Sequence, residues 1–379
     1  MLVMLDYFLV ITTSIYFITL FIFFSGLFFR NKKHQTKLYN VSVVIAARNE
    51  EKNIPHVLSD LIKQTYPSEI FEVIVVDDHS TDRTAEIVSQ IAANYSNIKI
   101  IKAQQDNTGR LVAKKNAIYQ GIKNSNGEII LSTDADCRIQ PWWIETMVSY
   151  FLEDVGMVVG FSQLGKKGEK RSLFEQLQAI DFLTLLSAAQ GALNVHYPLA
   201  STGQNLAYRK EAFEQVGGFK EIGHRISGDD VLLLQLIYKR TNWKIRFAPS
   251  PKSFNYSLPE KTLQKFSNQR KRWASNGSYQ FKLNKGFFLI VINTFLINLL
   301  LSIYLPFFLV LSKNPAVTLS CLFVKFLIEF LIILKGVQVY NRKDLIKYFP
   351  VWAVLQIPYV VIVGLLGNIG KFVWKGREN

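Results

Sequence analysis

Two short acidic motifs in this sequence have the spacing of residues that handle phosphate groups and protons. Asp134 and Asp136 directly follow an apolar run, in the stretch TDAD. In an extended stretch, side chains two positions apart point to the same side, so both carboxylates can serve one ligand. Carboxylates bind hard cations such as Mg²⁺ or Mn²⁺, which neutralise phosphate oxygens. The motif therefore predicts a metal site suited to a diphosphate leaving group.

The second acidic motif is SGDD, residues 227–230, which precedes an apolar run with helical spacing from Val231 to Tyr238. At the start of a helix the macrodipole favours an ionised carboxylate. Asp229 or Asp230 can then accept a proton from a hydroxyl nucleophile. A helix cap by Asp229 is the structural alternative, and the two interpretations are compatible.

A third motif, QRKRW at residues 269–273, combines basic, amide and aromatic side chains. On a helix, Gln269, Arg272 and Trp273 stand at i, i+3 and i+4 and share one face. Such a face can hold a diphosphate and stack on a sugar ring. The alternative is a basic, aromatic anchor at a membrane interface.

Alternating strands and helices must position these motifs. The pattern predicts an α/β fold with a mostly parallel sheet flanked by helices, in which ligands bind beyond the carboxyl ends of the strands. Polar residues follow three of the expected strands, including Arg48 and Glu50, Asp78, and the Asp134 motif. Neither GxGxxG after the first strand nor a P-loop is present, which disfavours dinucleotide oxidoreductases and P-loop ATPases. The expected strands are 41–47, 72–77, 98–103 and 128–132, and the expected helices are 50–64, 83–93 and 111–123.

Composition indicates a membrane protein with a water-soluble middle. Of the 379 residues, 49% are hydrophobic and only 19% are charged. Each of four long apolar runs has about the 20 residues that a spanning helix needs. In the third run, Lys325 and Glu329 stand at i, i+4, where they can pair or take part in function. The four runs are 8–29, 287–311, 315–334 and 349–369.

The net charge of +15 is concentrated beside these apolar runs. Basic residues there determine topology and attract anionic lipids, and no nucleic-acid-binding motif accompanies them. The basic residues after the first run predict that the middle of the chain lies in the cytosol, while Lys371 and Lys375 leave the topology of the tail open. Two cysteines make no disulfide framework. We expect an N-terminal transmembrane anchor at 1–30, a cytosolic catalytic domain at 31–285 and a membrane region with about three helices at 286–379.

Seven motifs in order carry a family resemblance: VSVVIAARNE (41–50), VIVVDDHSTD (73–82), GRLVAKKNA (109–117), STDADC (132–137), GQNLAYRK (203–210), SGDD (227–230) and QRKRW (269–273). Together they resemble a family 2 inverting glycosyltransferase. More narrowly, they resemble the membrane-bound branch that includes hyaluronan, chitin and cellulose synthases and ceramide glucosyltransferases. The resemblance implies a nucleotide-sugar domain of the GT-A type. The acidic pair reads GDD where cellulose synthases have TED, so kinship to that subgroup is not supported.

The resemblance also implies roles for individual residues. Asp230 aligns with the catalytic base, and Asp229 supports it. A metal ion would bind Asp136 and Asp134, and Gly203-Gln204-Asn205 would shape the acceptor side or merely permit a tight turn. The residues implied in binding the nucleotide sugar are Ala47, Arg48, Glu50, Asp78, Lys115 (or its neighbour Lys114), Asp134, Gln269, Arg272 and Trp273.

The function implied is transfer of a sugar from a UDP-sugar to a lipid-linked or glycan acceptor, with Mg²⁺ or Mn²⁺ and inversion at the anomeric carbon. The alternative is a processive β-linked polysaccharide synthase that extrudes its product. We expect an integral protein of a bacterial inner membrane with its catalytic domain in the cytosol. Its expected partners are the nucleotide sugar, the acceptor and membrane lipids, with no nucleic acid and no protein partner inferred.

Overall fold

A computed structural model describes residues 2–29, 37–106, 109–311, 315–369, 373–374 and 377–378. The chain forms two compact units, each built from separate stretches of sequence. We call residues 30–166 and 198–258 the sheet unit, and residues 1–29, 167–197 and 259–379 the helical unit. The boundaries predicted at residues 30 and 285 stay a prediction.

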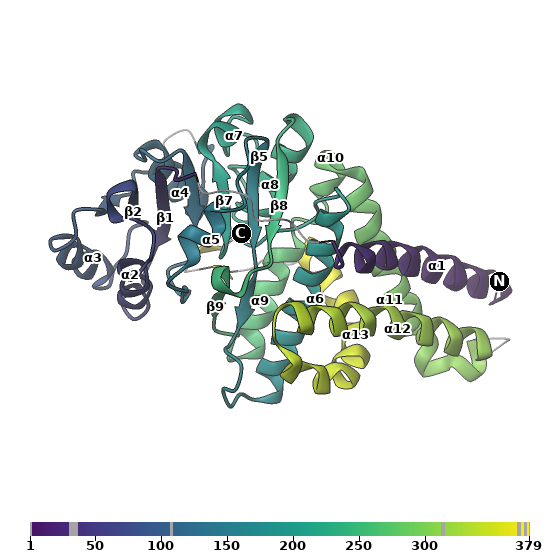
Figure 1. Cartoon of the computed structure of the whole chain (residues 1–379). Coiled ribbons are helices and arrows are strands. Elements are labelled where there is room, and N and C mark those ends of the chain that lie inside the picture. The colour runs from purple at the N-terminus through teal and green to yellow at the C-terminus, as the bar shows by residue number, and fades with distance from the viewer. Residues whose placement is uncertain are drawn as a thin grey trace. The chain divides into compact units, whose positions relative to one another are not determined.

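A seven-stranded sheet forms the centre of the sheet unit, with the order β3-β2-β1-β4-β7-β5-β8 (Figure 1). Strand β7 is antiparallel to both of its neighbours, and the other pairs are parallel. The predicted strands agree with the observed ones to within one residue at each end. The strands are β1 (Val41–Ala47), β2 (Phe71–Asp77), β3 (Ile98–Lys102), β4 (Ile129–Ser132), β5 (Val155–Gly160), β7 (Leu206–Arg209) and β8 (Lys244–Ala248), with β6 (Ser162–Leu164) and β9 (Asn255–Ser257) as a separate parallel pair.

Both faces of the sheet are covered, which explains why β1 and β2 are continuous apolar runs. Val43 and Ile45 of β1 pack with Leu58 and other residues of α2 in one core. Val44 faces the other way and meets α4 at Gly121, where a Cβ would lie 2.4 Å from the Val44 side chain. The helices of this unit are α2 (Ile54–Ile62), α3 (Thr84–Ala92), α4 (Ala113–Lys123), α5 (Trp143–Val148), α7 (Lys210–Gln215) and α8 (Val231–Arg240), with short 3-10 turns η1 (Ser68–Ile70) and η2 (Pro251–Ser253).

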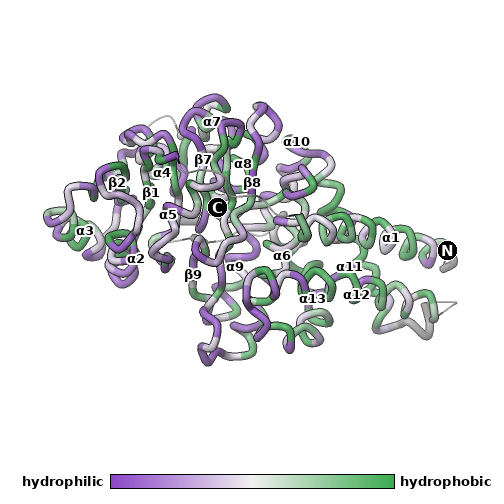
Figure 2. Tube along the Cα trace, viewed as in Figure 1, coloured by the Kyte–Doolittle hydropathy of each residue, from purple (hydrophilic) through white to green (hydrophobic). Residues whose placement is uncertain are grey.

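Four helices of the helical unit are long and apolar enough to cross a membrane, among the residues that the structure describes. They correspond to the four predicted runs, and Figure 2 shows the apolar character of α1, α11 and α12. The basic cluster before residue 37 and the tail residues Lys371 and Lys375 lie outside the described ranges. The elements of this unit are α1 (Leu2–Gly26), α6 (Leu173–Asn194), α9 (Leu263–Ala274), α10 (Gln280–Leu283), α11 (Lys285–Leu311), α12 (Pro315–Val339), η3 (Lys343–Tyr348), α13 (Phe349–Ile369), and strands β10 (Val373–Trp374) and β11 (Arg377–Glu378).

The predicted pairing within the third apolar run is confirmed. Lys325 Nζ lies 2.7 Å from Glu329 Oε1, and the two side chains are 0% and 2% exposed. Tyr16 of α1 donates to the same Glu329 oxygen at 2.7 Å, and Lys325 donates to Gln356 of α13 at 2.6 Å. This polar network therefore joins three of the four candidate membrane helices.

Candidate active site

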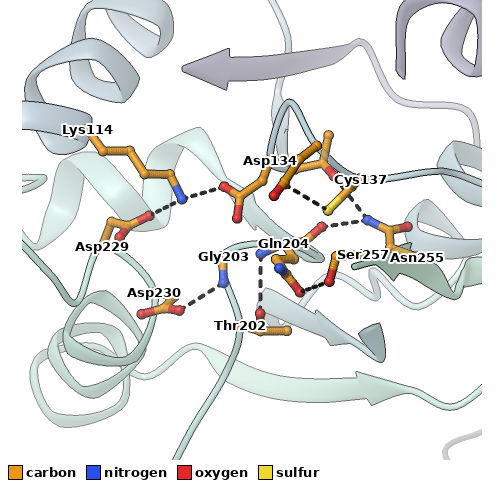
Figure 3. Close-up of polar contacts among 12 residues, drawn as sticks. Lys114, Asp134, Cys137, Thr202, Gly203, Gln204, Asp229, Asp230, Asn255 and Ser257 are labelled. Carbon is orange, nitrogen blue, oxygen red and sulfur yellow. Dashed lines mark hydrogen bonds and ion pairs between the residues drawn. The ribbon is translucent and has the colours of Figure 1, made fainter. Parts of the chain in front are cut away.

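The Lys114 ammonium bridges two carboxylates at the carboxyl edge of the sheet (Figure 3). Its Nζ lies 2.7 Å from Asp134 Oδ1 and 2.9 Å from Asp229 Oδ2. Lys114 stands in the first turn of α4, Asp134 follows β4, and Asp229 precedes α8. The side chains of Asp134, Lys114 and Asp229 are 30%, 15% and 10% exposed, so the cluster is partly open to solvent.

The backbone around the acidic pair holds Asp230 in a defined orientation. Gly228 has φ +87°, a left-handed conformation that glycine adopts without strain. Asp230 accepts hydrogen bonds from the backbone N–H of Val231 at 2.6 Å and of Gly203 at 2.8 Å. Asp230 therefore caps α8, and the expectation that Asp229 is the cap is wrong, because Asp229 is turned toward Lys114 instead.

The two adjacent carboxylates have opposite pKa shifts. Burial disfavours the charge on Asp229, but the ammonium groups of Lys114 and Lys115 outweigh burial and lower its pKa. For Asp230, burial and the negative charge of Asp229 act together and raise its pKa. When the surroundings shift the pKa values of two neighbouring carboxyl groups in opposite directions, one group stays ionised and the other can accept a proton. The one with the raised pKa, Asp230, is better matched to general base catalysis near neutral pH.

Gly203 lies close to this acidic pair, where a side chain would crowd its neighbours. A Cβ on Gly203 would lie 3.1 Å from Asp229 Oδ2 and 3.2 Å from Lys114 Nζ. Its backbone φ is not in the left-handed region, so the reason for glycine is the close approach. Asn205, two residues further on, is 0% exposed and donates to the carbonyls of Phe161 and Ser253. Asn205 therefore joins two neighbouring segments of the fold, and a role of residues 203–205 on the side of the sugar acceptor stays a prediction.

The structure distinguishes the two adjacent lysines of the GRLVAKKNA motif. Lys115, the lysine expected to bind the nucleotide, is fully buried and donates to the carbonyls of Arg225 at 2.6 Å and Ser227 at 2.7 Å. Burial lowers the pKa of Lys115 to about 8. Lys115 thus binds the backbone of the loop that leads into Asp229, whereas Lys114 contacts the carboxylates of Asp134 and Asp229. A signal for this was present in the sequence, because Lys115, Ile118 and Ile122 share one face of α4.

The residues expected around the nucleotide surround the ends of β1 and β2. The carbonyl of Ala47 accepts from the N–H of Asp78 at 2.8 Å, and Arg48 donates to the carbonyl of Asp78 at 3.0 Å. Ala47 is fully buried. Glu50 is 8% exposed and accepts from Asn53 at 2.7 Å. These contacts organise the strand ends, and a role in nucleotide binding stays a prediction.

The acidic loop after β4 supplies only some of the ligands that a divalent cation needs. Asp134 is partly exposed and Asp136 is exposed, so both carboxylates are within reach of a ligand. Among the described residues, no three His, Cys, Asp or Glu side chains converge as a metal-binding group. Mg²⁺ is commonly held by one or two carboxylates together with substrate phosphates. Asp134 and Asp136 fit a cation of this kind, which would complete its coordination with a bound diphosphate and water.

The QRKRW motif lies on α9 in the helical unit, and the predicted helix is confirmed. Gln269 donates to Glu260 at 3.3 Å, and Trp273 packs beside Phe182 with ring centroids 5.7 Å apart. The buried member is Arg270, whose guanidinium lies 3.1 Å from Asp181 Oδ2 and over the Trp273 ring. Roles for Gln269, Arg272 and Trp273 in substrate binding stay predictions.

The sheet, its acidic edge and the order of motifs agree with a family comparison. Residues 42–217 match the family described as glycosyl transferase family 2. The chain therefore contains a glycosyltransferase family 2 domain, as the motifs predicted. The match covers the strands from β1 to β7 and the loop that carries Asp134 and Asp136.

Curated relatives of known name match about two thirds of this chain. It is 28% identical over 251 residues to a beta-monoglucosyldiacylglycerol synthase of Nostoc sp., covering 66% of this chain and 51% of that protein. It is 24% identical over 266 residues to the poly-beta-1,6-N-acetyl-D-glucosamine synthase of Staphylococcus epidermidis, covering 67% of this chain and 58% of that protein. The chain thus spans about half the length of these relatives.

Among solved structures, the chain is similar to a mannosyltransferase from Pyrobaculum calidifontis, determined in complex with GDP-mannose and Mn²⁺. The TM-score is 0.61 with 17% identity, covering 96% of this chain and 99% of that chain. This likeness concerns the fold. The predicted GT-A fold, a mostly parallel sheet flanked by helices and accompanied by candidate membrane helices, is confirmed.

Proposed function

We propose that this chain is a membrane-bound inverting glycosyltransferase that moves a sugar from a UDP-sugar to a lipid-linked or glycan acceptor with Mg²⁺ or Mn²⁺. The observation that carries the proposal is the cluster of Lys114, Asp134 and Asp229 beside Asp230. It joins an ammonium group, the loop proposed to handle the diphosphate and the proposed proton acceptor at one edge of the sheet.

In this proposal Asp230 removes a proton from the acceptor hydroxyl. The hydrogen bonds from Val231 and Gly203 leave the Asp230 carboxylate fixed in direction, and burial and Asp229 raise its pKa, as a general base requires. The deprotonated oxygen attacks the anomeric carbon while the bond to the leaving UDP breaks. Attack from the face opposite the leaving group inverts the configuration.

Asp134 and Asp136 would hold the divalent cation, which when bound neutralises the charge of the diphosphate. Arg48, Glu50, Asp78 and the Ala47 backbone are the proposed contacts of the nucleotide. Gln269, Arg272 and Trp273 are proposed to hold the diphosphate and the acceptor sugar. The domain at 31–285 is proposed to face the cytosol, where nucleotide sugars are made.

The acceptor is proposed from the relatives and from the candidate membrane helices. A relative that is named for glucosylation of diacylglycerol favours a lipid acceptor. A relative named as a poly-β-1,6-N-acetylglucosamine synthase favours a second function, a processive polysaccharide synthase that extrudes its product. The two functions share the same sheet-edge chemistry and differ in the number of sugars added.

The experiment uses the full chain purified in mild detergent. Nucleotide release is measured with Mn²⁺ for a panel of UDP-sugars, with GDP-mannose as the competing donor, with and without native lipid extract. We expect UDP release from one sugar that depends on the lipid. The Asp136→Asn variant should lose this release, while Asp154→Asn, which removes an exposed carboxylate from an ion pair with Lys244, should keep it.

Each remaining outcome has a definite meaning. A large glycan retained by the enzyme without added lipid would replace the leading function with the polysaccharide synthase. Release of GDP alone would overturn the UDP assignment. Full activity of the Asp136→Asn variant would overturn the metal-binding role of the loop after β4.

A further inference from the structure

Asp134, one of the two proposed metal ligands, already has a cation as its partner. Lys114 Nζ donates to Asp134 Oδ1 at 2.7 Å, the length of a charge-assisted hydrogen bond. The same ammonium lies 2.9 Å from Asp229 Oδ2, so it is held from two sides (Figure 3). A divalent cation that binds Asp134 must therefore compete with a charge that belongs to the chain itself.

The position of Lys114 is built into the fold. Its side chain is only 15% exposed, and it stands in the first turn of α4, next to Lys115, whose two bonds to backbone carbonyls attach α4 to the loop before Asp229. A Cβ on Gly203 would lie 3.2 Å from Lys114 Nζ, so the backbone there passes close to the ammonium. Lys114 is therefore largely shielded from solvent and lies between Asp134 and Asp229.

We infer that Lys114 acts as a resident cation that keeps divalent metal affinity low until a diphosphate is bound. This inference rests on the proposed metal role of Asp134. Before a donor binds, the ammonium neutralises Asp134 and repels a second cation. A diphosphate offers Lys114 another anionic partner and offers the metal its missing oxygen ligands, so metal and donor bind together.

The inference identifies Lys114 as a residue that controls metal binding, in addition to any contact with substrate. Replacement by methionine keeps the length of the side chain and removes the charge. Without nucleotide, the Lys114→Met variant should bind Mn²⁺ about tenfold more tightly than the wild type, the scale of one hydrogen bond to a charged group. The Lys114→Arg variant keeps the charge and should retain weak binding.

The measurement is a titration of the detergent-purified full chain with Mn²⁺ alone, in which free Mn²⁺ is followed by electron paramagnetic resonance. Adding UDP should increase Mn²⁺ affinity strongly in the wild type and weakly in Lys114→Met. The double variant Lys114→Met with Asp134→Asn should lose the gain in affinity. Lys99→Met is the matched control, because it removes a lysine from an ion pair with Glu72 outside the site and should leave Mn²⁺ binding unchanged.

Two results would overturn the inference: equal Mn²⁺ affinity of Lys114→Met and the wild type without nucleotide, or the same gain in the Asp134→Asn double variant. The melting temperature of each variant checks that the variant is folded. If Lys114→Met is not folded, the Lys114→Arg variant gives an independent answer. The titration needs no sugar transfer. A gain in Mn²⁺ affinity without transfer activity would support the inference and contradict the proposed function. Transfer activity without the gain in Mn²⁺ affinity would support the proposed function and contradict the inference.

Discussion

Two lysines of this protein each contact a carboxylate at 2.7 Å, yet their surroundings are very different. Lys325 in the helical unit has a single carboxylate partner, Glu329, and both side chains are excluded from solvent. Lys114 in the sheet unit contacts two carboxylates, Asp134 and Asp229, and the cluster is partly exposed. The first group is balanced in charge, whereas the second has more negative than positive charge.

The difference supports the proposal that the Lys114 cluster, and not the Lys325 pair, accepts a ligand. A balanced, buried pair has no excess negative charge to attract a second cation, and its bonds to Tyr16 and Gln356 connect candidate membrane helices to one another. Without a hydrophobic driving force between helices in lipid, such polar contacts specify how the helices pack. The carboxylates around Lys114 outnumber that ammonium at an open sheet edge, so they can hold a further cation once a diphosphate is bound. The same ion-pair distance thus occurs in a pair that connects helices and in the cluster that we propose to bind the substrate.

The largest expected effect is on catalysis at the sheet edge. Asp230→Asn keeps the shape of the side chain and removes its ability to accept a proton, so kcat should fall by about 10³-fold, within the range for general base catalysis. The measurement is sugar transfer at saturating donor and acceptor. The melting temperature should change little. Activity within about threefold of the wild type would show that the carboxylate of Asp230 is not the base.

The second expected effect is on stability in the helical unit. Glu329→Gln leaves the Lys325 ammonium without its counter-ion among apolar residues and should lower the free energy of unfolding by about 3 kcal/mol. The double variant Lys325→Met with Glu329→Leu removes both charges and should recover most of that loss. Thermal unfolding in detergent measures both. An equal loss of unfolding free energy in the double variant would contradict the structural role of the pair. Loss of transfer activity in a stable double variant would show that the pair takes part in function.

The smallest expected effect is a change in pH dependence. The charge of Asp229 raises the pKa of Asp230, while Lys114 opposes this increase and Lys115 lies close by as a further positive charge. The base must be ionised, so kcat/KM falls as the pH drops through the pKa of Asp230. Asp229→Asn removes a negative charge and should move this acid limb to lower pH, whereas Lys114→Met should move it to higher pH. Shifts in the same direction in both variants would contradict this electrostatic account.

Much of the fold was predictable because it depends on local patterns. The strands from 41–47 to 128–132 are continuous apolar runs, since helices cover both faces of the sheet, and each ends where polar residues begin. The membrane helices were predictable from length and hydropathy. The acidic motifs after β4 and before α8 were recognisable from residue type and spacing, and the family match covers the first of them.

The details of the site were harder to predict from the sequence. The choice between Lys114 and Lys115 depends on which face of α4 is buried, and the choice between Asp229 and Asp230 as helix cap depends on a turn at Gly228. The importance of Gly203 arises from its contact with the acidic pair, which lies 26 to 27 positions further along the chain. The contact of Gly203 joins residues distant in sequence, so no local pattern reports it, whereas the burial of Lys115 follows the apolar face of α4.

The sequence by itself determined the class of fold, the candidate membrane helices and the residue types available for chemistry, because hydrophobic periodicity and side-chain composition are local properties. Only the tertiary structure decided that Lys114 lies between Asp134 and Asp229 and that Lys115 donates to carbonyls of the neighbouring loop. It also decided that Asp230 accepts hydrogen bonds from two backbone N–H groups. Hydrogen bonds and charge interactions depend on distances of a few ångströms between segments that are far apart in the chain, and folding sets those distances.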